Sequence, residues 1–156
     1  MRRALALLIA STGLAACGPK LIPGTEIRDN DDNHQILALL TEYRGALEAR
    51  SVDSVMKLVS PRFFDDAGTA DGGDDFDYEG LRAKLANWVS KTQTVRANIQ
   101  VRRIDVKGDL ATVRFYYELN YQLKGMEDGL TWKRDADSKE MTLRREEGRW
   151  MISRGI

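Results

Sequence analysis

The spacing of apolar residues changes once along this chain of 156 residues, close to Lys91. Before that point apolar side chains recur every three or four residues, as on one face of a helix. After it they alternate with polar side chains, as in half-buried strands. Helices followed by a run of hairpin-linked strands predict an α+β fold, with the helices packed on one face of an antiparallel sheet.

The first predicted helix begins near Asp32. Ile36, Leu39, Leu40, Tyr43 and Leu47 form a single apolar stripe. Asp32 and Gln35 have the spacing of a capping box, in which each side chain bonds an unpaired backbone amide. This helix therefore has one face for a core.

Two shorter helices are expected next. Ser51 is the predicted cap of the second, whose apolar residues lie at 52, 55, 56 and 59. Asp77 is the predicted cap of the third, whose apolar face holds Leu81, Leu85, Trp88 and Val89. Phe63 and Phe64 suggest a short strand between the two helices.

The second half predicts four strands. Residues 95–101 alternate, and the alternation resumes one residue late after Arg102 and Arg103, which indicates a bulge. A turn at 107–109 leads to a long strand over 111–123. The polar stretch 124–138 is expected to be irregular, and the last two strands are expected around Met141 and Trp150.

The N-terminus has the pattern of an export signal. Arg2 and Arg3 precede an apolar run at 4–10, which is shorter than the ~20 residues that span a bilayer, and small residues follow. Residues 14–17, Leu-Ala-Ala-Cys, resemble the bacterial lipobox. The resemblance implies cleavage before Cys17 and acyl chains on that cysteine, and the chain is then a membrane-anchored lipoprotein. Because Gly18 is not aspartate, it implies the outer membrane, facing the periplasm.

These patterns divide the chain into three parts. Residues 1–16 are the predicted signal peptide, residues 17–31 the lipidated cysteine and a tether rich in proline and glycine, and residues 32–156 one domain. Without residues 1–16 the chain has 22 basic and 24 acidic residues. This balance argues against nucleic acid as a partner, because nucleic-acid binding needs a clearly basic face.

The domain resembles the nuclear transport factor 2 superfamily, which includes ketosteroid isomerase and polyketide cyclases. The resemblance is carried by residues 43–53 (YRGALEARSVD), 58–60 (LVS), 63–66 (FFDD) and 148–152 (GRWMI). It implies a cone-shaped α+β fold, in which the N-terminal helices pack on a curved antiparallel sheet.

The same resemblance suggests positions for catalysis. Tyr43 matches the first-helix tyrosine of the isomerase-like enzymes, and Asp65 or Asp66 lies close to their base position. The late acid would be Glu140, which alternates against Met141 and should face away from the core. Since no convergent set of groups emerges, we predict a non-enzymatic binding or scaffold domain at the cell envelope. The alternative is an isomerase- or dehydratase-type enzyme that uses Tyr43 with Asp65 or Asp66.

Aromatic residues suggest where a small apolar ligand could bind. Such sites are mostly apolar with a few polar groups. The predicted lining of a pocket between helices and sheet is Tyr43, Phe64, Trp88, Phe115, Tyr117 and Trp150. A filled core has the same composition, so both interpretations stay open, and no cofactor is expected.

Two clusters of charge have alternative interpretations. The segment 65–77 holds six aspartates that could bind calcium, but it lacks EF-hand spacing, so a flexible acidic loop is expected. No metal site is predicted, because His34 has no second nitrogen or sulfur ligand once Cys17 is acylated. Arginines on the strands favour either an acidic partner or a cross-strand charge ladder. Partners are therefore the membrane, a small apolar ligand or an envelope protein, and a second copy of the chain through the sheet.

Overall fold

A computed structural model describes residues 18–66, 74–124 and 132–156. Its elements follow the order α1 (Asp31–Glu48), α2 (Val52–Met56), β1 (Phe64–Asp65), β2 (Phe76–Asp77), α3 (Tyr78–Lys91), β3 (Thr92–Lys107), β4 (Leu110–Leu123), β5 (Trp132–Glu146) and β6 (Arg149–Arg154). The α+β class predicted from the change of period is confirmed.

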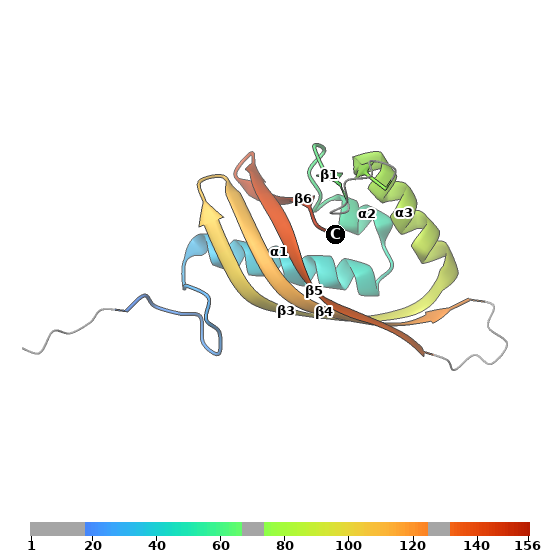
Figure 1. The fold of residues 1–156 in the computed structure, drawn as a ribbon, viewed down its shortest axis with the longest axis horizontal. Coiled ribbons are helices and arrows are strands. Elements are labelled where there is room, and N and C mark those ends of the chain that lie inside the picture. Colours follow the sequence, from blue (N-terminus) through green and yellow to red (C-terminus); the bar gives the residue numbers. More distant parts are fainter. Residues whose placement is uncertain (1–17, 67–73, 125–131) are drawn as a thin grey trace, which may run out of the picture.

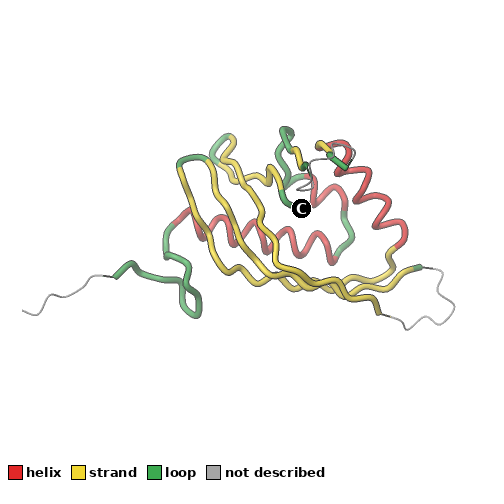
Figure 2. The backbone as a smooth tube through the Cα atoms, viewed as in Figure 1, coloured by secondary structure: helices red, strands yellow, loops and turns green. Residues whose placement is uncertain are grey.

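The four long strands form one antiparallel sheet in the order β3-β4-β5-β6, and β1 pairs separately with β2. The sheet is strongly bent, and α1 runs along its inner face while α2 and α3 lie across from its far end (Figure 1). The C-terminus lies between the sheet and the α2–α3 pair. The backbone trace shows the strands as one continuous layer that wraps around the helices (Figure 2).

The core lies between α1 and the inner face of the sheet. The predicted stripe of α1 is buried from Ile36 to Leu47. It packs with the alternate residues of the strands, which are Ala111, Val113, Phe115, Met141, Leu143, Trp150 and Ile152. The bulge predicted after Val101 is present as a register shift between Val101 and Arg103. No helix within the described ranges is both long enough and apolar enough to cross a membrane.

The predicted start of the first helix was wrong. The cap of α1 is Asn30 rather than Asp32, and its side chain accepts a hydrogen bond from the Asn33 amide. Ordered structure also begins before the predicted domain start at 32, because Leu21 pairs with Arg28 and Ile27 is buried. The part of the predicted tether next to the helix is therefore folded onto the domain.

The largest difference concerns β5. This strand was predicted to begin near Met141, but it begins at Trp132 and pairs with β4 from there to Arg144. The alternation of apolar residues is missing from 132 to 140 because this part has charged residues on both faces. Met141 and Leu143, further along the same strand, are fully buried. Hydrogen bonding to β4 maintains the strand where no core requires apolar side chains.

Candidate functional site

A cavity of about 170 Å³ lies between α1, α3 and the inner face of the sheet. Most of its lining is apolar, and the polar side chains come from β4, β5 and α1. The lining residues are Tyr43, Leu47, Leu85, Trp88, Ile99, Phe115, Tyr117, Leu119, Asp135, Lys139, Gly155 and Ile156. An apolar space with a few polar groups is typical of small-molecule sites.

Tyr43 is the polar side chain that α1 contributes to the cavity. It lies on the buried stripe of the helix and is only 7% exposed. Burial, followed by the nearby Tyr117, raises the pKa of Tyr43 far above its ordinary value. Its hydroxyl makes no hydrogen bond to any residue in the described part of the chain. A neutral phenol is thus held in an apolar wall with its hydrogen-bonding capacity unused.

Tyr117 and its neighbours on β5 form a polar group at one side of the cavity. The Tyr117 hydroxyl donates to Asp135 Oδ2 over 3.1 Å, and Lys139 Nζ lies 5.3 Å from the centre of the tyrosine ring. These contacts follow from strand register. Tyr117 lies opposite Asp137, and Asp135 and Lys139 are each two residues from Asp137, on the same face of β5. Burial, and then the hydrogen bond to Asp135, raises the pKa of Tyr117 to about 12.

The end of the chain forms another wall of the cavity. The amide of Gly155 donates to Asp65 Oδ2 over 2.9 Å, and Asp65 is only 8% exposed. The neighbouring Arg154 pairs with Asp66. Gly155 has a φ of +85°, and a Cβ at this position would lie 2.2 Å from the carbonyl oxygen of Glu140. The segment therefore needs glycine here, and Asp65 holds it against β5.

The structure brings together part of the predicted pocket. Tyr43, Trp88, Phe115 and Tyr117 all line the cavity. Phe64 does not, since it lies on the outer side of β1 and is 53% exposed.

Trp150 is buried away from this lining, and the guanidinium of Arg145 lies 4.4 Å from the centre of its ring. Neither Asp65 nor Asp66 is a lining residue either. The predicted pairing of Tyr43 with one of these aspartates is therefore not assembled in the cavity. Glu140 is exposed and pairs with Arg114, as expected for a side chain on the outer face.

Asp135 and Lys139 were missed by the sequence reasoning. They lie in the stretch predicted to be irregular, where no apolar residues mark a strand. A signal was nevertheless present, because charged residues at 135, 137 and 139 alternate with the residues at 134, 136 and 138. Both sets are largely polar, so their alternation does not show which face of the strand points inward.

The metal predictions concern other parts of the molecule. His34 is exposed and its Nε2 lies 2.7 Å from Asp29 Oδ1. Within the ranges that the structure describes, no three histidine, cysteine or acidic side chains are arranged to hold a metal ion. Residues 67–73 of the acidic segment lie outside the described ranges, as does Cys17. The flexible acidic loop, its calcium-binding alternative and the acylation of Cys17 therefore stay as stated from the sequence.

Comparison with known proteins identifies the fold. No protein-family model and no curated protein matches the sequence. Among solved structures, a proposed scytalone dehydratase from Novosphingobium aromaticivorans has a TM-score of 0.68 at 12% identity, with 80% of each chain covered. A ketosteroid isomerase-like protein from Erwinia carotovora atroseptica has a TM-score of 0.66 at 16% identity, covering 81% of this chain and 94% of that one.

A third similar structure is a proposed dehydratase of the nuclear transport factor 2-like family from Streptomyces avermitilis. Its TM-score is 0.64 at 14% identity, and 80% of this chain and 92% of that one are covered. Identities this low establish the fold and leave the activity open. The helices on a curved antiparallel sheet, together with these similarities, show that the chain has the nuclear transport factor 2-like fold.

Proposed function

We propose that this domain binds a small, largely apolar molecule in the cavity beside Tyr43. The observation that carries the proposal is Tyr43, a buried residue that lines an apolar cavity and whose hydroxyl makes no hydrogen bond among the described residues. A ligand with an oxygen atom at this point would accept a hydrogen bond from the Tyr43 hydroxyl, and such a bond contributes a net ~0.5–1.5 kcal/mol.

The size of the cavity limits the ligand to about one ring. An engineered apolar cavity of roughly 150 Å³ binds benzene, and this cavity has about 170 Å³. Sites for larger ligands are typically about 300–1,000 Å³. A ring of six atoms with one oxygen substituent fits this volume, whereas four fused rings do not.

Phenol and toluene test the proposal, because they differ only in a hydroxyl and a methyl group. Binding can be followed through the fluorescence and NMR signals of Trp88, which lines the cavity. We expect phenol to bind about 2–10 times more tightly than toluene, since a net hydrogen bond contributes roughly 0.5–1.5 kcal/mol. Tyr43→Phe should remove this preference, and Tyr116→Phe, on the outer face of the sheet, should keep it. If neither compound perturbs Trp88, the proposal fails.

A second candidate function is catalysis, and the presence of Asp135 in the same cavity favours it. A carboxylate that removes a proton next to a carbonyl needs a donor for the oxygen that becomes negative. Asp135 and Tyr43 could take these two roles. Two of the similar structures are proposed dehydratases.

Exchange of protons for deuterium separates the two candidates. Cyclohexanone in D2O would lose its α-proton NMR signals faster with an active enzyme than with buffer. Asp135→Asn should then abolish the exchange and retain phenol binding. If the protein binds phenol but does not accelerate deuterium exchange of cyclohexanone, the result supports a binding domain and argues against catalysis.

We also propose that the domain is anchored to the cell envelope through acyl chains on Cys17. The support is the resemblance of residues 14–17 to the lipobox after a short apolar run. Cys17→Ala should leave an unprocessed precursor, detected by mass spectrometry of the membrane fraction. Normal cleavage of the variant would contradict the proposal, and fractionation of the native protein tests the outer-membrane destination.

A further inference from the structure

The structure separates the strand arginines into two groups. Most of them pair with an acidic side chain. These pairs are Arg103 with Asp105, Arg114 with Glu140, Arg134 with Glu118, Arg145 with Asp32 and Asp109, and Arg154 with Asp66. Of these pairs, Arg114 with Glu140 and Arg134 with Glu118 join neighbouring strands, so the cross-strand charge ladder considered from the sequence is present there.

Arg96 and Arg102 of β3 have no acidic partner among the described residues, but Arg96 lies over the Trp132 ring and Arg102 donates to Gln100 Oε1. Three further arginines, one of them outside the strands, differ from both groups. Within the described ranges, Arg62, Arg144 and Arg149 have no acidic group at ion-pair distance. All three line one open groove of about 480 Å³. Among the described strand arginines, the two that have neither an ion pair nor such a contact, Arg144 and Arg149, both lie at this groove.

The groove crosses the outer face of the sheet, opposite the side that packs on α1. Arg144 lies in register between Leu110 of β4 and Met151 of β6. Pro61 and Arg62, which follow α2, close the groove beside β6. Since Tyr43, Tyr117 and the other cavity residues do not contribute to it, the groove is separate from the cavity.

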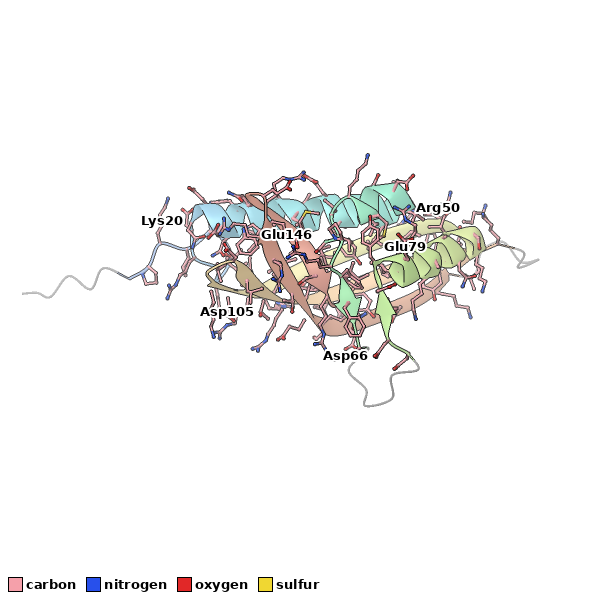
Figure 3. The ribbon with its side chains drawn as sticks, turned by 90° about the horizontal axis from the view of Figure 1, so that it is seen from above. Lys20, Arg50, Asp66, Glu79, Asp105 and Glu146 are labelled. Carbon is pink, nitrogen blue, oxygen red and sulfur yellow. The ribbon has the colours of Figure 1, made fainter. Side chains whose placement is uncertain are left out.

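The charge of the groove is positive. Four arginines and three acidic side chains line it. Asp109 pairs with Arg145, and Glu146 accepts a hydrogen bond from the buried Ser60 hydroxyl over 2.8 Å. Figure 3 labels Glu146, which is the last residue of β5. The third acid, Glu147, is exposed at the turn before β6. The guanidinium groups of Arg144 and Arg149 remain available to a partner.

The groove also has an apolar part. Leu110 is 46% exposed, which is unusual for a large apolar residue in this domain, and Met151 and Pro61 line the groove beside it. Isolated exposed apolar residues are ordinary, but here the apolar side chains lie among unpaired arginines. An anion without an apolar part would contact the arginines of the groove and leave its apolar side chains uncovered.

We propose that this groove binds an acidic peptide segment of a partner protein, with one apolar side chain over Leu110 and carboxylates on Arg144 and Arg149. The planar guanidinium matches a carboxylate with two parallel hydrogen bonds. Arginine is also enriched at protein interfaces, where charge complementarity determines partner choice. Charge and shape together select a peptide rather than a simple anion.

Fluorescence anisotropy with a labelled peptide tests the assignment. The probe is EELEE, compared with EEGEE and KKLKK, on the whole chain without residues 1–16. We expect EELEE to bind most tightly and more weakly at 150 mM than at 20 mM salt. Arg144→Ala with Arg149→Ala should weaken binding at least tenfold. Arg96→Ala with Arg102→Ala removes the same charge from β3 and should change the affinity less than twofold.

Four results would overturn the proposal. The first is equal weakening by both pairs of substitutions, which indicates only a net-charge effect. A second is equal affinity for EELEE and EEGEE with displacement by millimolar inorganic phosphate, which indicates an oxyanion site. A third is a dimer of this chain that Arg144→Ala with Arg149→Ala dissociates in analytical ultracentrifugation, which makes the groove a self-association surface. The fourth is no binding of EELEE at 20 mM salt.

Discussion

Replacement of Gly155 by alanine tests how the cavity wall is held. The backbone at Gly155 has a φ of +85°, a conformation that residues with a side chain rarely adopt. The added methyl group would lie 2.2 Å from the carbonyl oxygen of Glu140 and 2.9 Å from the Cα of Met141. Both atoms belong to the backbone of β5, whose hydrogen bonds to β4 prevent a local shift. The end of the chain must therefore move instead.

The cost has two parts. The left-handed conformation costs a residue with a side chain about 1–2 kcal/mol, and overpacking typically costs about 1–3 kcal/mol. The total of roughly 2–5 kcal/mol is a large share of the ~5–15 kcal/mol that stabilises a domain. A displaced segment would also lose its hydrogen bond to Asp65 and withdraw Gly155 and Ile156 from the cavity. Phenol affinity should fall at least tenfold.

Gly148→Ala is the matched control. Gly148 has a φ of +79°, yet a Cβ there has no neighbour within 4 Å. This variant should lose only about 1–2 kcal/mol and bind phenol as the native protein does. Urea unfolding and phenol titration of both variants measure the two effects. Equal stability and equal affinity of the two variants would refute the close approach of Gly155 to β5.

Three further predictions concern stability. Trp150→Ala should lower the free energy of unfolding by about 3–5 kcal/mol, because the side chain is 5% exposed and its loss leaves a cavity; a melting temperature within two degrees of the native one would contradict this. Tyr43→Phe should leave the free energy of unfolding in urea unchanged or slightly higher, because the hydroxyl has no partner among the described residues, and a loss above ~1 kcal/mol would indicate one. The pKa of Tyr117 is raised to about 12 in the folded protein, whereas a tyrosine in the unfolded chain has a pKa of about 10. The contribution of this group to the free energy of unfolding should therefore be complete below about pH 10 and be lost as the pH rises through 12. Urea unfolding measures how much the free energy of unfolding falls between pH 9 and pH 11. This fall should be smaller for Tyr117→Phe than for the native protein, and an equal fall would be evidence against the raised pKa.

The fold could be predicted where burial imposes a pattern on the sequence. Ile36 and Leu47 lie on the same face of α1 because a helix of this length needs one apolar face for the core. The caps Ser51 and Asp77 were also correct, since both side chains accept the expected backbone hydrogen bonds. The prediction that Asp32 caps α1 was wrong because the side chains of three neighbouring residues, Asn30 to Asp32, can all accept such a bond. The path of the preceding chain selects Asn30.

The site could be predicted only in part, for a related reason. Phe63 and Phe64 are adjacent, so they point to opposite sides of the chain. The sequence does not tell which of them faces inward, and the structure buries Phe63 to 2% exposure while Phe64 is exposed. Trp150 was correctly predicted to be buried, but its place along β6 puts it beside Arg145 instead of the cavity. Burial is encoded locally, whereas the position of a cavity depends on how elements meet.

Asp65 shows how residue type can mislead about a role. The resemblance to isomerase-like enzymes made Asp65 a candidate for a catalytic carboxylate, because it lies close to their base position. In the structure its Oδ2 accepts the amide of Gly155, so this carboxylate positions the cavity wall. The acid that does reach the cavity, Asp135, comes from a strand that the sequence does not mark.

The missed strand and the polar side of the cavity have one physical cause. Helix α1 packs on the part of the sheet that holds Met141 and Leu143, and there β5 is apolar and fully buried. Further from α1 the same inner face of β5 presents Asp135 and Lys139, both of which remain exposed while they line the cavity. Charged side chains are tolerated on an inward face only where water can reach them. The absence of an apolar pattern from 132 to 140 therefore marks the side on which the cavity meets solvent, and a ligand whose ring contacts Trp88 would place its polar substituents toward Tyr117 and Asp135.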